Sequence, residues 1–366
     1  MESVLYESVV SDLTARPIRM GSRNLDKPAA RKMAKEQTSN GAKLERSCAE
    51  RAKHHLSAEV RLISSKRQTS SKAFLNHDYA LWRGDVEEFL INLPKTPLFD
   101  LVLTSPPYNL GKEYEDRVAL KEYWAWQKRI IALIVPRLKP NGSLCWQVGN
   151  FVNKNEIFPL DIEFAPLFKR HHLRLRNRII WRFGHGLHTQ TRFSGRYEVV
   201  MWYTKSAKPD SPYTFNLDAV RIPAKYPGKR HYKGPNSGKL SGNPLGKNPE
   251  DVWDIPNVKS NHVEKTIHPC QFPVGLVERL ILALTKSGDL VFDPFAGSAS
   301  TGVGAAIHGR RFWGCEIVRR YAEVGRKRIQ SAINGKADYR PHTKPVYDHT
   351  RSTLSHFPEE FLRPKQ

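Results

Sequence analysis

Apolar residues follow two different periods between residues 78 and 205. Short apolar runs such as FDLVLTSP at 99–106 predict strands, whereas VEEFLINLP at 86–94 and the stretch at about 120–138 repeat every three or four positions and predict helices. The alternation returns at 272–333. The predicted strands lie at residues 78–85, 99–106, 173–183, 195–205, 289–295 and 311–317, and one more follows a helix stop and a Pro-Asn-Gly turn within 138–150. Strands that alternate with helices predict an α/β fold whose parallel sheet is covered on both faces.

Three segments lack this alternation and divide the chain. Residues 1–72 are basic, rich in Ser and Ala and poor in aromatic residues, so we expect a mostly disordered arm, or an extension without function. Residues 206–262 are dense in Pro, Gly, Asn, Lys and Arg, which indicates a functional or disordered region. Residues 334–366 form a polar tail that we expect to be loose. The remaining parts, 73–205 and 263–333, are then two halves of one domain.

The charge balance predicts a polyanionic partner. The chain has 59 Lys and Arg against 36 Asp and Glu, a formal net charge of +23, which suits nucleic acid or an anionic membrane surface. The sequence contains no run of about 18 apolar residues, so no transmembrane helix is predicted. Because no basic amphipathic helix dominates the sequence either, nucleic acid is the better prediction, and no membrane association is expected.

The cysteines argue for a reducing compartment. The four cysteines are scattered without a C-x-x-C pair, which argues against a disulfide framework or a zinc site and predicts no metal. The first twenty residues lack the basic start and apolar core of a secretory signal. Both observations predict a cytoplasmic protein.

One candidate motif is DLVFDPFAGSASTGVGAAIHGRRFWGCEI at 289–317. A strand ends at Asp293, a turn of small residues follows, a helix begins near Ser300, and a second strand ends in Glu316, 23 positions after Asp293. This is the layout of a nucleotide site in an open α/β sheet, where an acid about twenty residues on holds ribose hydroxyls. The turn lacks the Lys of a phosphate-binding loop, so a triphosphate is not expected. A turn packed tightly for structural reasons is the alternative.

The other candidate motif is TSPPY at 104–108. Each proline fixes its own φ and disfavours a helical residue before it, so Ser105 and Pro106 are held extended at the carboxyl end of a strand, where α/β sheets bind ligands. The Ser105 hydroxyl and the Pro106 carbonyl then offer two hydrogen-bond acceptors, and Tyr108 offers a ring face. This set suits the exocyclic amine of a flat base. A proline-rich turn and a Ser-Pro phosphorylation site are the alternatives.

Together these motifs resemble those of the amino-methylating DNA methyltransferases that use S-adenosylmethionine. TSPPY resembles the tetrapeptide [DNS]-P-P-[YFW], DPFAGSAST resembles the cofactor loop D-P-F-x-G-[ST]-G-[ST]-T, HPCQFP at 268–273 resembles H-P-x-[QE]-K-P, and GCEIVRRY resembles G-x-E-x-x-x-x-Y. The tetrapeptide precedes the cofactor loop, as in the β group of the family. The resemblance implies a Rossmann-like, open, mostly parallel seven-stranded sheet with helices on both faces, which is the class I methyltransferase fold with a circularly permuted motif order.

The resemblance also implies a role for each matching residue. A methyl group would pass from S-adenosyl-L-methionine to the exocyclic amine of a base flipped out of double-stranded DNA. Glu316 would bind the ribose, Asp293 and the following turn the methionine end, and Asp85 the adenine, unless Asp85 merely opens a helix. The implied catalytic residues are Ser105, Pro106, Pro107 and Tyr108. The implied cofactor residues are Asp293, Pro294, Phe295, Ala296, Gly297, Ser298, Thr301, Glu316, His268 and Asp85.

Two departures from the family pattern affect the cofactor side. Ala299 replaces the second glycine of the cofactor loop, so we expect a negative φ there, or room for a methyl group near the cofactor. Phe272 stands where many relatives carry Lys, so it is assigned no polar contact.

The acceptor base is inferred from one residue. Ser at the first tetrapeptide position is associated in the family mainly with N4-cytosine methylation, and Asp or Asn mainly with N6-adenine, so N4-cytosine is predicted and N6-adenine is the alternative. Methylation at C5 of cytosine would need a Pro-Cys nucleophile. Pro269-Cys270 lies out of place for that role, and we interpret Cys270 as a packed cysteine.

Residues 206–262 are the predicted target-recognition region, with a solvated basic loop as the alternative. Arg and Lys can contact phosphates or guanine edges. The predicted DNA-binding residues are Lys225, Lys229, Arg230, Tyr232 and Lys233, and Arg174, Arg176, Arg178 and Arg182 are expected to face the DNA.

Several alternatives stay open at this point. A non-catalytic DNA-binding protein with the same fold is one, and an RNA or protein methyltransferase is another. The resemblance implies a bacterial or phage-encoded enzyme. It allows a cognate restriction endonuclease that acts separately, and either a monomer or a homodimer.

Overall fold

The computed structural model describes residues 59–64, 71–109, 118–184, 186, 188–205, 211–348, 350, 352 and 355. Most of the predicted N-terminal arm lies outside these residues. Its last part is structured, because strand β1 (Arg61–Ser64) and the 3₁₀ helix η1 (Ser71–Asn76) both fall before or across the predicted boundary at residue 72.

The centre of the fold is a nine-stranded sheet in the order β1-β2-β11-β10-β3-β4-β8-β7-β9. Within this sheet only β8 runs antiparallel to its neighbours. The other strands are β2 (Tyr79–Arg83), β3 (Phe99–Thr104), β4 (Leu138–Val148), β7 (Arg174–Arg182), β8 (Tyr197–Thr204), β9 (Val252–Asp254), β10 (Leu290–Asp293) and β11 (Arg311–Glu316). All seven predicted strands form. The sheet has two more because β1 and β9, which are too short to show a period, pair with its edges.

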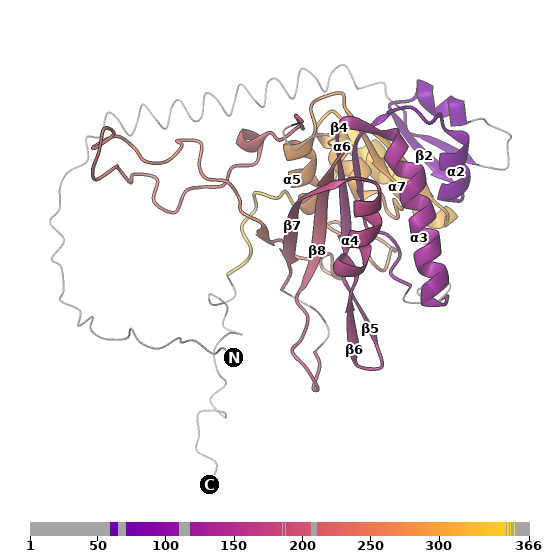
Figure 1. The fold of residues 1–366 in the computed structure, drawn as a ribbon, viewed down its shortest axis with the longest axis horizontal. Helices are drawn as coiled ribbons and strands as arrows, with labels where there is room; N and C mark the ends of the chain where they lie inside the picture. The colour runs from indigo at the N-terminus through magenta and orange to yellow at the C-terminus, as the bar shows by residue number, and fades with distance from the viewer. Residues whose placement is uncertain are drawn as a thin grey trace, which may run out of the picture. The chain divides into compact units, whose positions relative to one another are not determined.

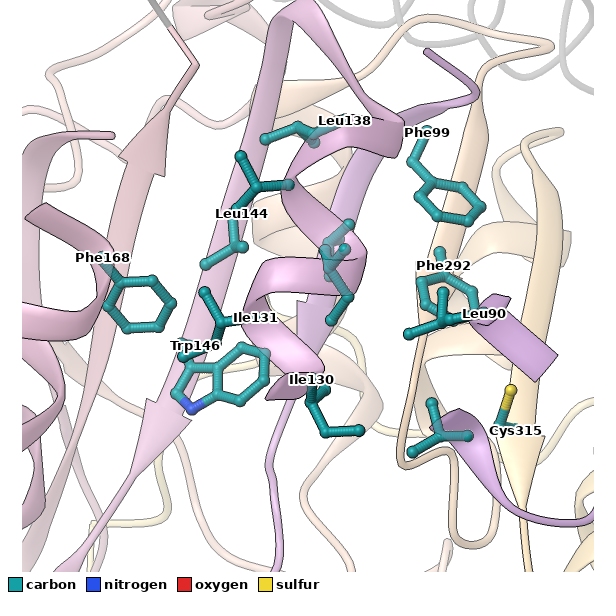
Figure 2. Close-up of a cluster of buried hydrophobic side chains, with 14 of the residues drawn as sticks. Leu90, Phe99, Ile130, Ile131, Leu138, Leu144, Trp146, Phe168, Phe292 and Cys315 are labelled. Carbon is teal, nitrogen blue, oxygen red and sulfur yellow. The ribbon is translucent and has the colours of Figure 1, made fainter. Parts of the chain in front are cut away.

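Helices cover both faces of the sheet, as expected (Figure 1). One face carries α2 (Val86–Asn92), α3 (Leu120–Ile134) and α4 (Leu160–Arg170), and the other carries α5 (Val274–Leu284), α6 (Ser300–Ile307) and α7 (Arg319–Ile333). Side chains alternate along each strand, so Phe292 of β10 packs into the first core and Val291 into the second. Figure 2 shows the first core, where Leu90, Ile131 and Phe168 from its helices pack over the strands.

Residues 149–170 contain structure that the sequence pattern did not predict. Strands β5 (Asn150–Asn153) and β6 (Glu156–Pro159) form a separate hairpin, and α4 follows it directly. Helix α4 contains Pro166, which weakens its sequence signal because proline disfavours helix interiors. Its buried residues Phe164 and Phe168 nevertheless pack on Trp146 of β4.

Residues 221–247 form an irregular arm that extends away from the sheet in Figure 1. Two isolated bridges, Ile222 with Lys247 and Arg230 with Leu240, hold its two sides together. The arm belongs to the predicted recognition region, which also contains the strand β9.

The segment after α7 is packed where we expected a loose tail. The backbone N–H groups of Arg340 and His342 donate to the carboxylates of Glu264 (3.0 Å) and Glu278 (2.7 Å). A Cβ at Gly275 of α5 would lie 2.8 Å from the Arg340 carbonyl oxygen, so the segment crosses α5 closely. Among the described residues, no helix has both the length and the apolar character needed to cross a bilayer.

Candidate active site

A cavity of about 750 Å³ opens at the carboxyl ends of β2, β3, β10 and β11. This edge is the expected ligand site of an open α/β sheet, because the neighbouring strands β10 and β3 lead in opposite directions, β10 to β11 and β3 to β4. The cavity brings together the TSPPY loop, the HPCQFP segment and the cofactor loop, which lie far apart in the sequence. All four predicted catalytic residues line it. So do eight of the predicted cofactor residues, namely Asp85, His268, Pro294, Phe295, Ala296, Gly297, Ser298 and Glu316.

The catalytic loop follows β3 and is held by α3. The Tyr123 hydroxyl of α3 donates to the Pro107 carbonyl at 2.8 Å. Next along the loop, the Asn109 side chain pairs with both the N–H and the C=O of Val118, at 2.8 Å each. Neither Tyr123 nor Asn109 was predicted as a site residue, since helical spacing makes Tyr123 look like an ordinary core residue. They position the tetrapeptide from outside it.

A line of hydrogen bonds leads from Ser105 to a carboxylate. The Ser105 and Tyr108 hydroxyl oxygens are 3.2 Å apart, and the Tyr108 hydroxyl donates to Oε1 of Gln147 at 3.1 Å. Nε2 of Gln147 donates in turn to the Glu198 carboxylate. Burial raises the pKa of Tyr108 well above its usual range. Burial also raises the pKa of Glu198 to about 7, and the hydrogen bond from Gln147 and the polar Tyr108 hydroxyl offset only part of that effect.

Gln147 and Glu198 also line the cavity, and both were missed in the sequence. The available signal was Glu198 itself, a lone carboxylate in the otherwise apolar strand YEVVMWYT. A charged residue at such a position is rarely buried unless it is hydrogen-bonded or functional.

Asp293 does not line the cavity but joins the two motifs behind its wall. Its carboxylate accepts hydrogen bonds from the hydroxyls of Thr104 (2.6 Å) and Thr301 (2.6 Å) and from the N–H of Phe295 (3.1 Å). The side chain is fully buried, and burial raises its pKa to about 6 despite these hydrogen bonds. Thr104 immediately precedes Ser105, so Asp293 ties the cofactor loop to the catalytic loop. Thr301 likewise lies behind the wall.

Glu316 faces the cavity at the end of β11. Its two carboxylate oxygens accept the N–H groups of Gly297 (2.8 Å) and Val318 (2.7 Å), and burial raises its pKa to about 7. A carboxylate oxygen has a second lone pair, so both oxygens can still accept from a pair of hydroxyls. The donor set therefore fits the ribose of a nucleoside cofactor.

The cofactor loop passes close to His268. Gly297 has φ +54°, and a Cβ there would lie 2.9 Å from Nε2 of His268. Nδ1 of His268 accepts the N–H of Cys270 at 3.2 Å, and its ring meets the Tyr321 ring edge-on at 4.5 Å. The Arg328 guanidinium of α7 also holds the loop, because it donates to the Ser298 carbonyl at 2.6 Å. The loop is thus a narrow cradle that a side chain at Gly297 would fill, as close backbone approach to a cofactor requires.

The expectation of a negative φ at Ala299 is wrong. Ala299 has φ +59° and ψ +42°, in the left-handed region, and it precedes α6 as its N-cap residue. Its methyl group is buried and points to α7, because a Cβ on Gly325 would lie 3.0 Å from it. The methyl group therefore avoids the cavity, which Ala299 does not line.

Two other residues near the cavity have clear structural positions. The Asp85 carboxylate accepts the N–H of Glu88 at 3.0 Å and caps α2, in addition to lining the cavity. Cys270 is exposed and lines the cavity, so the interpretation as a packed cysteine is wrong. The reason is that the HPCQFP segment runs along the cavity wall and does not enter the core.

The predicted DNA-binding residues lie together on the irregular arm. All are exposed, and Tyr232 is 88% exposed. These residues are Lys225, Lys229, Arg230, Tyr232 and Lys233.

The arginines of β7 have protein partners instead: Arg178 pairs with Asp161, Arg182 pairs with Asp254, and Arg176 lies 4.2 Å over the Tyr213 ring. β7 therefore contributes less free positive charge than its sequence suggested.

Comparison with known proteins places the chain among DNA-modifying enzymes. A family model for N6- and N4-methyltransferases, described as DNA methylase, matches residues 99–327. The type II methyltransferase M.BglII of Bacillus subtilis is 45% identical over 249 residues, which cover 68% of each chain. The DNA adenine methyltransferase YhdJ of Escherichia coli K12 is 33% identical over 278 residues, covering 72% of this chain and 87% of YhdJ.

A solved structure supports the fold assignment. The PvuII DNA methyltransferase, described as cytosine-N4-specific, superposes with a TM-score of 0.53 at 21% identity and covers 69% of this chain and 90% of its own. Similarity at this level shows the fold, which is the predicted class I methyltransferase fold. With the matched family model and the sequence relatives, it follows that this chain belongs to the DNA methylase family of N6- and N4-methyltransferases.

Proposed function

We propose that this protein transfers a methyl group from S-adenosyl-L-methionine to N4 of cytosine in double-stranded DNA. The observation that carries the proposal is the shared cavity, which joins Ser105 and its loop to the Glu316 carboxylate and the small-residue cofactor loop. Ligand pockets typically have volumes of about 300 to 1,000 Å³, so a cavity of about 750 Å³ is large enough for a cofactor.

The cofactor half of the cavity would hold S-adenosylmethionine. Glu316 would accept hydrogen bonds from the ribose hydroxyls, and the Pro294–Ser298 turn would line the methionine end. Asp293 and Thr301 would hold that turn in place without touching the ligand. When bound, S-adenosylmethionine supplies an electrophilic methyl group. The protein must then activate the amine that attacks this group.

The catalytic loop would make the amine a better nucleophile. The lone pair of a base amine is delocalised into the ring, and hydrogen bonds from the amine to Ser105 and to the Pro106 carbonyl would localise it as charge develops. The loop would also hold the amine in line with the methyl group. To reach the loop, the base must leave the duplex stack at a cost of a few kcal/mol, and Tyr108 would face it.

The base assignment rests on Ser105, because Ser at this position is associated in the family mainly with N4-cytosine. The specific alternative is N6 of adenine, which the 33% identity to an adenine methyltransferase favours. The 45% identity to a type II methyltransferase supports a further part of the proposal, that a separate restriction endonuclease shares the recognition sequence.

DNA would be bound by residues 206–262. The arm carries seven Lys and Arg between residues 221 and 247 and no Asp or Glu, so it can contact phosphates along the duplex. Lys225, Lys229, Arg230 and Lys233 would bind the backbone, and the exposed ring of Tyr232 would stack or insert.

Expression of the gene in a methylation-deficient bacterial host tests the proposal. Sequencing that detects modified bases should find N4-methylcytosine at one short sequence in cells with the natural protein and none in cells with Ser105→Ala. The Ser105→Ala protein should still bind DNA and S-adenosylmethionine, because the substitution leaves the arm and the cofactor loop unchanged. Modification at adenine would select the alternative, and equal modification by both proteins would refute the role of Ser105.

A further inference from the structure

The hydrogen bonds that connect Ser105 to Glu198 have a direction. Nε2 of Gln147 can only donate, and it donates to the Glu198 carboxylate. Oε1 of the same amide can only accept, and it accepts the Tyr108 hydroxyl at 3.1 Å. With its proton directed to Gln147, the Tyr108 oxygen is free to accept, and Ser105 lies 3.2 Å away as the donor.

This direction decides what Ser105 can offer to a substrate. A serine hydroxyl has one proton and two lone pairs. When the proton is donated to Tyr108, the lone pairs are available to the cavity that Ser105 lines. If these hydrogen bonds ran in the opposite direction, the Ser105 proton would face the cavity and would repel an amine that must donate to Ser105.

We propose that Glu198 is a positioning residue for methyl transfer: its carboxylate fixes the direction of the chain Glu198–Gln147–Tyr108–Ser105 and thereby keeps Ser105 an acceptor for the base amine. The inference rests on the proposed function and deepens it. An ionised end group also polarises each hydrogen bond along the chain, which makes the Ser105 oxygen a stronger acceptor.

The groups around Glu198 indicate that its ionisation controls the chain. Tyr108, from the loop after β3, is the titratable group whose hydroxyl helps to stabilise the carboxylate, and Gln147 of β4 and Trp181, its register partner on β7, are uncharged. Only the carboxylate form is limited to accepting from Gln147. Since burial raises the pKa of Glu198 to about 7, the direction is fixed above this pH and is lost progressively below it.

Single-turnover kinetics on the full-length protein test this inference. The probes are unmethylated phage λ DNA and S-adenosylmethionine with a tritiated methyl group, at saturating cofactor so that its binding does not enter the rate. The variants are Glu198→Gln, which keeps the shape and removes the charge, Tyr108→Phe, which cuts the chain but keeps the ring, and their combination. Glu323→Gln, which changes a half-exposed carboxylate that pairs with Arg319 on α7, is the matched control.

We expect the wild-type rate to rise with pH through about 7 and then level off. Each single variant should be slower at high pH by about tenfold or more, and neither should show the rise near pH 7. Tyr108→Phe is decisive even if Glu198→Gln folds poorly, because it leaves the carboxylate in place and should still lose the pH dependence. The double variant should be no more than about twofold slower than the slower single variant, because both substitutions interrupt the same row of hydrogen bonds.

Other results overturn the inference. Wild-type rates in Glu198→Gln, a retained pH dependence in Tyr108→Phe, or losses that multiply in the double variant would each show that Glu198 does not act through the chain. Cofactor affinity should match that of Glu323→Gln, and a purely structural role of Glu198 would change it. If the wild-type protein transfers no label, the proposed function fails and the inference fails with it. Label transfer that is indifferent to Glu198 contradicts the inference alone.

Discussion

Ala299 shows how a single methyl group is accommodated at the cofactor loop. A non-glycine residue in the left-handed region costs about 1 to 2 kcal/mol, yet Ala299 occupies it with φ +59°. The compensation lies across the loop in α7, where Gly325 leaves room for the methyl group. The two positions therefore form a pair in which one side chain is present and the other is absent.

Moving the methyl group from position 299 to position 325 should be tolerated, whereas a methyl group at both positions should not. We expect Gly325→Ala alone to lower the free energy of unfolding by about 1 to 3 kcal/mol, because the two Cβ atoms would be only 3.0 Å apart. Adding Ala299→Gly should recover most of this loss, since it removes the contact and the left-handed strain, and alanine favours α7 by about 1 kcal/mol over glycine. Urea unfolding of the natural protein and the variants measures these differences.

Ala299→Gly alone serves as the control. Relief of strain should roughly balance the lost burial, worth about 0.8 kcal/mol, and the greater freedom of glycine in the unfolded chain. A double variant no more stable than Gly325→Ala would show that the two residues are not a packing pair.

Some residues of the site could be identified from the sequence, and others could not. The TSPPY and DPFAGSAST motifs carry local signals, since prolines and small residues restrict the backbone where they occur. Ser105, Glu316 and most of the cofactor loop could therefore be predicted, and the structure brings them into one cavity. Gln147 and Glu198 depend on the pairing of β4 with β8, which joins residues about fifty positions apart. No local pattern reports such a pairing.

At the scale of elements, Asp293 connects three pieces of the fold. It ends β10, accepts from Thr104 at the end of β3, and accepts from Thr301 in α6. A buried carboxylate thus joins the two halves of the site at the sheet edge. A substitution in one half should therefore affect the stability of the other half.

Removing the Thr104 hydroxyl should weaken this connection in a pH-dependent way. We expect Thr104→Val to lower the free energy of unfolding by about 1 to 3 kcal/mol at neutral pH, because a buried carboxylate loses a donor. The pKa of Asp293 is already raised to about 6, and the loss of a donor raises it further. The folded variant then holds its proton to higher pH, so the loss should be small below about pH 5 and should grow as the pH rises past 6.

Thr104→Ser is the matched control, since it keeps the hydroxyl and removes only a methyl group. Its loss of about 1 kcal/mol should be independent of pH. Denaturant unfolding at several pH values distinguishes the two variants. A pH-independent loss in Thr104→Val would show that the hydroxyl does not stabilise the ionised form of Asp293.

Elements with strong periods were predicted well and weak ones were not. The seven predicted strands and the predicted helices at 86–94, at about 120–138 and near Ser300 all formed, with small shifts at their ends. Helix α4 was missed because Pro166 interrupts its pattern, and β9 was missed because three residues show no period. Both depend on packing against β4 or β7, which is tertiary information.

At the scale of the molecule, the net charge of +23 is distributed unevenly. The arm at 221–247 carries only positive charge and extends from the sheet (Figure 1). Such a surface should bind DNA largely through its phosphates, with an affinity that falls as salt rises.

Replacing three lysines of the arm should reduce this salt dependence. We expect Lys225→Ala, Lys229→Ala and Lys233→Ala together to weaken DNA binding and to lower the slope of log affinity against log salt by up to about 3, since each lost phosphate contact contributes about 0.9. Fluorescence anisotropy with a labelled duplex at several salt concentrations measures the slope. Cofactor affinity should not change, because the arm does not line the cavity.

The control removes the same charge elsewhere. Lys95, Lys286 and Lys336 are exposed and lie at or near the amino ends of strands or past α7, away from the cavity edge. Replacing these three with alanine should leave the slope nearly unchanged. An equal loss in both triple variants would show that net charge, and not the arm, governs binding.

The chemical identity of the methylated nucleoside tests the central claim most directly. Purified protein, unmethylated duplex DNA and S-adenosylmethionine with a labelled methyl group are incubated, and the DNA is digested to nucleosides and analysed by mass spectrometry. The account predicts label on an exocyclic amine, specifically as N4-methylcytosine, and none with Ser105→Ala. Label only in N6-methyladenine would overturn the base assignment, and label at C5 of cytosine, or no label in any nucleoside, would contradict the account as a whole.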